Sequence, residues 1–119
     1  MPIKVKHDDE TGFGFVLKMD GKKVGYTSDT EYYDGIGESY KGCDLLIVNN
    51  LKAEDDNVPG HLYTKTTVQL LCKAKPKLAV LSHIGMRLIK SGPDKEARKI
   101  GKLSGVKTIC ADDGMRIRI

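Results

Sequence analysis

The sequence predicts an α/β domain built on a mixed sheet, and two kinds of segment lead to that expectation. Two short apolar runs, DLLIVN at residues 44–49 and LAVL at residues 78–81, are typical of strands that are covered on both faces. Helices are expected at residues 61–75, where apolar residues recur near helical spacing, and at residues 93–103. Strands that alternate with helices along a chain are the pattern of an α/β layer. With 119 residues, the chain is expected to form one domain, residues 1–119.

The remaining elements are expected from turn and terminator residues. Asp20-Gly21, a dipeptide that hairpin turns favour, joins predicted strands at residues 13–18 and 23–27. Pro93 stands in the first turn of the second helix, and Gly105 follows its end. Residues 28–39 and 51–60 are polar and are expected to be loops, with one helical turn at residues 38–41. Further strands are expected at residues 2–6, 106–110 and 115–119, the last two on either side of an Asp-Gly turn.

Charge and composition argue against several classes of protein. The net charge of +4 comes from 20 basic and 16 acidic residues that are interleaved, whereas nucleic-acid binders usually cluster their basic residues on one face. A nucleic-acid partner is therefore only weakly supported. No stretch approaches the roughly 18 apolar residues of a membrane span, and the N-terminus carries no apolar leader, so no membrane partner is expected. Three cysteines without CxxC spacing, each among apolar neighbours, indicate buried thiols in a reducing, cytoplasmic compartment.

Three candidate metal ligands stand in loops that leave predicted strands. His7 follows the first strand, Asp29 the third, and His83 the LAVL strand. Such loops usually carry the ligands of α/β sheets, because the backbone is anchored there while the side chains are free. Two imidazoles and a carboxylate form a set that Zn²⁺ or iron binds at about 2.0–2.2 Å. Each residue alone is more often a loop or capping residue, so the combination carries the prediction.

Five segments taken together resemble the C-terminal half of the metallo-β-lactamase superfamily: GYTSDT, DLLIVNN, GHLYTKT, LAVLSHIG and ADDGMRI. The resemblance implies half of an αββα sandwich, in which a mixed sheet carries helices on one face. It also implies that Asp29 bridges two metal ions, that His7 completes the first metal site, and that His83 completes the second. The expected cofactor is Zn, as a pair of ions in the complete family fold. The resemblance leaves the substrate open, because one fold serves many chemistries.

The histidine-rich HxHxDH motif of the family does not occur in these 119 residues, which hold three histidines in all. We therefore expect a fragment or subunit of a metal-dependent hydrolase that contributes part of a dinuclear site and is inactive alone. The alternative is a non-catalytic interaction domain derived from the same fold. The two apolar strands need cover on both faces, and the helices supply only one. The expected partner is the missing N-terminal half or a second copy, bound through the exposed sheet face.

His61 is the candidate catalytic residue. The segment GHLYTKT resembles the corresponding part of the transfer-RNA processing endonuclease branch of the superfamily (RNase Z). In that branch a histidine near the start of a helix aids phosphodiester cleavage, and a protonated imidazole there can stabilise developing oxyanion charge. The structural alternative is that His61 simply enters the helix and packs or meets water.

Overall fold

The computed structural model describes residues 1–53 and 57–119. Its sheet has seven strands, of which six follow the order β1-β2-β3-β4-β6-β7, while the short β5 pairs with β4. Strand β2 is antiparallel to both of its neighbours, β1 and β3, while β3, β4, β6 and β7 are parallel. The prediction of an α/β domain with a mixed sheet is confirmed. The strands are β1 (Pro2–Lys4), β2 (Phe13–Met19), β3 (Lys22–Tyr26), β4 (Leu45–Lys52), β5 (Leu62–Tyr63), β6 (Leu78–Ser82) and β7 (Thr108–Cys110).

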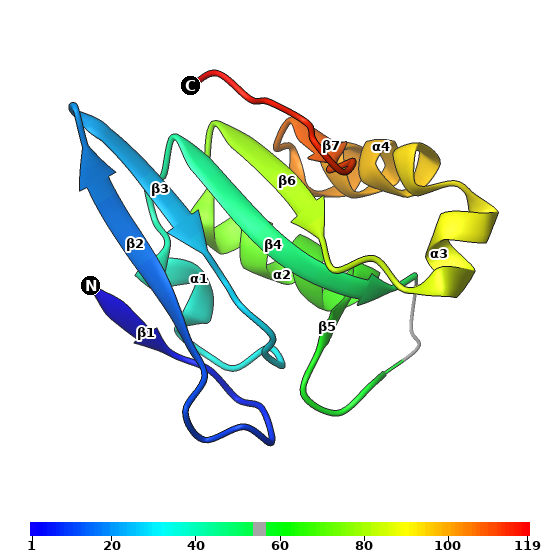
Figure 1. Cartoon of the computed structure of the whole chain (residues 1–119), viewed down its shortest axis with the longest axis horizontal. Helices are drawn as coiled ribbons and strands as arrows, with labels where there is room; N and C mark the ends of the chain where they lie inside the picture. The colour runs from blue at the N-terminus through cyan, green and yellow to red at the C-terminus, as the bar shows by residue number, and fades with distance from the viewer. Residues whose placement is uncertain (54–56) are drawn as a thin grey trace.

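Three helices cover one face of this sheet, as the resemblance implied (Figure 1). They are α1 (Ile36–Ser39), α2 (Thr64–Ala74) and α4 (Pro93–Ser104), and their buried side chains join one core cluster with β2, β4 and β6. The short helix α3 (Met86–Ser91) lies beyond the end of the sheet, on the chain between β6 and α4. No helix in the described part of the chain is long and apolar enough to cross a bilayer.

The opposite face of β2 is apolar and open. Along this strand Gly14 and Val16 are buried toward the helices, while the alternate residues point the other way. Phe13, Leu17 and Met19 on that other side are 56%, 53% and 69% exposed. Because successive strand residues face opposite sides of a sheet, the strand presents a row of large apolar side chains to solvent. Singly exposed apolar residues are common on proteins, whereas this row is continuous along one face of the strand.

Tyr40 anchors the antiparallel strands to the core. It is fully buried just after α1, its hydroxyl donates a hydrogen bond to the carbonyl oxygen of Tyr26 (3.1 Å), and burial raises the pKa of that hydroxyl. The ring has room because two strand residues that face it are glycines. A Cβ on Gly14 would overlap the Tyr40 hydroxyl, and a Cβ on Gly25 would lie 2.9 Å from a Tyr40 ring carbon. Tyr40 is therefore a core residue and does not line a substrate pocket.

Some sequence-based expectations need correction. Residues 115–119 form no strand, so the turn at 112–115 joins no pair of strands. The helix expected from residue 61 begins at Thr64, because Leu62 and Tyr63 pair with β4 instead. Residues 51 and 52, predicted to lie in a loop, belong to β4. The predicted 51–60 loop also includes residues 54–56, which lie outside the described residues. Cys72 is exposed, whereas Cys43 and Cys110 are buried as expected.

Candidate metal centre

Four loops bring all three histidines and Asp29 to one edge of the sheet. His7 lies in the β1–β2 loop, Asp29 follows β3, His61 directly precedes β5, and His83 follows β6. Strands β3, β4 and β6 are parallel, and β1 has the same direction because it is antiparallel to β2, which is antiparallel to β3. Their carboxyl ends therefore meet at the same edge, where ligand sites of α/β sheets usually lie.

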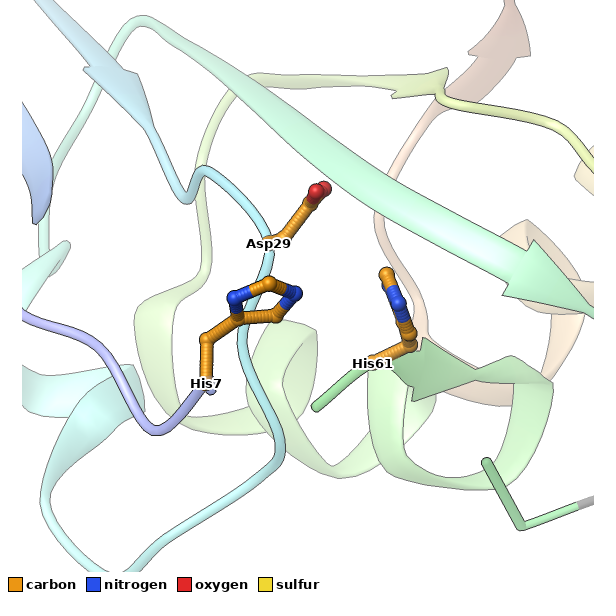
Figure 2. Close-up of side chains that lie close together, drawn as sticks. All are labelled: His7, Asp29 and His61. Carbon is orange, nitrogen blue, oxygen red and sulfur yellow. The ribbon is translucent and has the colours of Figure 1, made fainter. Parts of the chain in front are cut away.

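His7, Asp29 and His61 form the tightest group. One donor atom from each of the three lies within 4.8 Å of the donor atoms of the other two, and their side chains converge from three separate loops (Figure 2). The rings of His7 and His61 meet edge to face with centroids 5.3 Å apart. Two imidazole nitrogens and a carboxylate oxygen at this spacing are a donor set that a transition-metal ion such as Zn²⁺ accepts.

His83 lies next to both Asp29 and His61. Its Nε2 lies 3.6 Å from the Asp29 Oδ1 atom, and its ring is tilted against that of His61 with centroids 5.5 Å apart. The His83 backbone has a left-handed φ of 54°, which is uncommon for a residue other than glycine. The structure thus brings the three predicted ligands and the predicted catalytic residue into one cluster, and it places His61, rather than His83, in the tightest group.

His61 is held in its neutral form. Burial lowers the pKa of its ring, the neighbouring Asp29 carboxylate opposes that shift, and His83 and His7 add to it. The lowered pKa favours the neutral imidazole, whose ring has one nitrogen that donates a hydrogen bond and one that accepts. The Nδ1 atom of His61 is buried and has no hydrogen-bond partner in the described part of the chain. A buried polar atom without a partner is costly in a native protein, so this atom fits a site that expects a ligand.

The loop that carries Asp29 is tied firmly to the end of β4. The backbone N–H of Asn49 donates to Thr27 Oγ1 (3.1 Å), and the Asn49 side-chain Nδ2 donates to Asp29 Oδ1 (2.7 Å). Between these two contacts Ser28 adopts a left-handed φ of 58°. Strained backbone of this kind persists only where the surrounding contacts hold it, and it is frequent at functional sites.

Glu31 links the loops of two histidines. Its carboxylate accepts a hydrogen bond from the backbone N–H of Gly60 (2.9 Å) and pairs with the Lys6 ammonium group (2.7 Å). Gly60 directly precedes His61, and Lys6 directly precedes His7. The contacts with Lys6 and Gly60 lower the pKa of Glu31, so the carboxylate stays charged. Sequence patterns did not single out Glu31 or Asn49. For Asn49 a signal was available, because two asparagines directly follow the apolar DLLIV run.

The His7 ring carries a constraint on how it can bind a metal. The backbone N–H of Asp9 donates to His7 Nδ1 (3.1 Å), so the neutral ring bears its proton on Nε2. Coordination through Nε2 requires that proton to move to Nδ1 and the contact with Asp9 to open.

A cavity of about 580 Å³ opens beside His83. It lies between the loop after β6 and the residues after β7, and Ile89 and Pro93 contribute its apolar wall. Asp112 and Asp113 also line the cavity, together with Ser82 and His83. A concave space adjoining a cluster of potential ligands is where a substrate would lie.

The fold is that of half of a metallo-β-lactamase-type α/β protein, and comparisons with known proteins agree. The family described as beta-lactamase superfamily domain matches residues 1–84. An uncharacterized protein of Methanocaldococcus jannaschii is 31% identical over 116 residues, which are 96% of this chain and 43% of that protein. The chain belongs to the metallo-β-lactamase superfamily.

Solved structures show the same fold. The metallo-β-lactamase fold protein YhfI of Bacillus subtilis superposes with a TM-score of 0.85 at 19% identity, covering 96% of this chain and 46% of YhfI. The short form of human tRNase Z superposes with a TM-score of 0.51 at 25% identity, covering 63% of this chain and 31% of the human protein. The chain therefore spans less than half the length of the relatives that it matches.

Proposed function

We propose that this chain contributes one half of the dinuclear metal site of a metal-dependent hydrolase. The observation that carries the proposal is the convergence of four side chains from four loops: His7, Asp29 and His61 within 4.8 Å, and His83 3.6 Å from Asp29. The two buried polar atoms without partners in the described residues, on His61 and Asn49, also belong to this cluster.

Each residue has a role that its chemistry supports. Asp29 would hold both ions, because an anionic carboxylate offsets the repulsion between two dications. His7 and His83 would each hold one ion through a neutral ring nitrogen. When bound, the ions would supply a hydroxide nucleophile at neutral pH. His61 would lie against the developing negative charge of the substrate and stabilise it through a hydrogen bond donated by its ring N–H.

The sequence similarity to human tRNase Z favours a phosphodiester substrate for the assembled hydrolase over the other bonds cleaved on this fold. The HxHxDH motif, which supplies the remaining ligands in the family, does not occur in these 119 residues. Those ligands would come from an N-terminal half. That half would cover the open sheet face that exposes Phe13, Leu17 and Met19. For the chain on its own, a second copy is the partner that presents a matching apolar face.

The decisive experiment combines the chain with an HxHxDH-bearing half and follows hydrolysis of a nitrophenyl phosphodiester. The chain alone should be inactive, and the combination should be active. Asp29→Asn should abolish the activity by removing the bridging charge. The matched control is Asp20→Asn in the β2–β3 turn, where asparagine tolerates the left-handed φ of 50°. Full activity of Asp29→Asn would refute the bridging role.

The alternative function, a non-catalytic interaction domain, is favoured by the open apolar row on β2. Such a domain would need no metal. Its thermal stability would be the same with Zn²⁺ as with a chelator, whereas any ligand that binds only the native state raises stability by mass action. Differential scanning fluorimetry with and without Zn²⁺ separates the two functions.

A further inference from the structure

Asn49 is a buried polar residue placed against the candidate metal centre. It stands near the end of β4, directly after the apolar run, and is 5% exposed. Its Nδ2 donates to Asp29 Oδ1 (2.7 Å) and also lies within hydrogen-bond distance of the Tyr26 hydroxyl (3.3 Å). An amide in the interior of a protein is kept only where its hydrogen bonds repay its burial.

We propose that Asn49 is the positioning residue that fixes the orientation of the Asp29 carboxylate for metal binding. The inference rests on the proposed function in one respect, because it takes Asp29 as a metal ligand. A carboxylate has two oxygens and about four lone-pair sites. Asp29 can therefore keep the bond from Asn49 to Oδ1 and still offer oxygen lone pairs to metal ions.

An amide donor is suited to this task for electrostatic reasons. A lysine or arginine at position 49 would neutralise the Asp29 charge and compete with a cation for it. A carboxylate there would repel Asp29. The neutral amide of Asn49 restrains the carboxylate and leaves its full negative charge for the metal. Partners that orient metal ligands in this way commonly change metal affinity by 10–100-fold when they are removed.

The second amide atom supports the same assignment. The Oδ1 atom of Asn49 is buried and has no hydrogen-bond partner in residues 1–53 and 57–119. Turning the amide over would bring this acceptor against the Asp29 oxygen, where two acceptors repel each other, so the carboxylate fixes which way the amide points. The Asn49 side chain thus donates a hydrogen bond to Asp29 while its own carbonyl oxygen has none. This arrangement is unexpected for a residue that serves stability alone.

The backbone of Asn49 has a separate role that a substitution would spare. Its N–H bond to Thr27 Oγ1 holds the start of the Asp29 loop whatever side chain stands at position 49. The neighbouring Asn50 gives a matched control. Its amide accepts from Thr67 Oγ1 (2.6 Å) and donates to the Lys52 carbonyl oxygen (3.2 Å), both away from Asp29.

The test is a Co²⁺ and Zn²⁺ titration of the chain, read by calorimetry and by the visible absorption of bound Co²⁺. Asn49→Leu, which is nearly isosteric and lacks a donor, should weaken metal binding 10–100-fold and alter the Co²⁺ spectrum. The same substitution in an Asp29→Ala background should cause no further loss. Asn50→Leu should lower the melting temperature and leave the metal affinity of the folded protein unchanged.

The outcomes separate this inference from the proposed function. Asn49→Leu with the wild-type affinity and spectrum would overturn the positioning role while leaving the metal site in place. An equal loss of affinity in Asn50→Leu would show that any disturbance of β4 has this effect, which also overturns it. Absence of Co²⁺ binding by the wild-type chain at millimolar metal would overturn the positioning role in this chain, while the proposed function is tested separately by hydrolysis in the presence of the HxHxDH-bearing half.

Discussion

Replacing Glu31 with alanine tests whether the cluster is held together by its surroundings. The Glu31 carboxylate joins the residue before His7 to the residue before His61, through Lys6 and Gly60. Removing it cuts both links at once and leaves the candidate ligands themselves unchanged. We expect the two loops to loosen, the fold to lose stability, and metal affinity to fall because His7 and His61 no longer converge.

The expected loss of stability follows from the exposure of the two contacts. Lys6 is 65% exposed and Glu31 27% exposed, so their ion pair contributes at most about 0.2–1 kcal/mol. The hydrogen bond from the Gly60 N–H contributes about 1 kcal/mol. The combined loss for Glu31→Ala is about 1–2 kcal/mol, which corresponds to a fall in melting temperature of roughly 4–10 °C for a domain of this size. Glu31→Gln keeps an acceptor for Gly60 and should lose about half as much.

The dependence on pH identifies the carboxylate as the cause. The folded-state pKa of Glu31 is lowered from the ordinary value of 4.5, so its contribution is present above pH 4.5 and is lost as the pH falls through the folded-state pKa. The difference in melting temperature between wild type and Glu31→Ala should therefore be full at pH 7 and should shrink steadily below pH 4.5. Thermal unfolding followed by circular dichroism over this range measures it.

Glu10→Ala is the matched control, because Glu10 is an exposed carboxylate in the β1–β2 loop. It should change the melting temperature by no more than a degree or two. If Glu31→Ala resembled this control, or if its deficit were equally large at pH 7 and pH 3, then the carboxylate would not connect the loops. Unchanged Zn²⁺ affinity in Glu31→Ala would likewise show that the convergence of the histidines does not depend on it.

Three further expectations concern metal, packing and assembly. Calorimetry on the isolated chain should find at most one weak Zn²⁺ site, and two tight sites would contradict the assigned roles. His61→Ala should leave the bound metal content unchanged, and loss of metal in that variant would also contradict them. Gly14→Ala should cost about 1–3 kcal/mol in urea unfolding, because its methyl group overlaps the Tyr40 hydroxyl. In sedimentation equilibrium the chain should behave as a dimer or larger even oligomer that Leu17→Lys weakens, and a monomer of 13.1 kDa at high concentration would refute the sheet-to-sheet contact.

Local signals in the sequence were enough for the elements that depend on local physics. Asp20-Gly21 adopts the left-handed backbone that a hairpin turn requires, with φ of 50° and 72°. The apolar runs became the adjacent parallel strands β4 and β6. Elements that depend on distant partners were missed. Strand β5 exists because β4 continues to Lys52 and offers it an edge, and the six residues of α3 are too few to show a helical period.

The residues of the candidate site also fall into those that local sequence reveals and those that depend on distant contacts. His7, Asp29 and His83 could be found because each follows a predicted strand, and parallel strands gather their carboxyl ends at one edge. Which histidine lies in the tightest group with Asp29 depends on the path of the loops, and a sequence pattern holds no information about that path. Asn49 and Glu31 were missed for a related reason. Their importance comes from what they touch across 20 and 29 residues of sequence.

The packing of the Tyr40 ring against two glycines limits which substitutions this protein can accept during evolution. Its ring occupies space that side chains on Gly14 and Gly25 would otherwise fill, so the three positions form a single volume distributed over β2, β3 and the end of α1. A smaller residue at position 40 would leave a void, and a larger one at either glycine would collide with the ring. Relatives should therefore exchange these positions together, and an alignment would show them as a covarying triplet even though residues 14 and 40 are far apart in the chain.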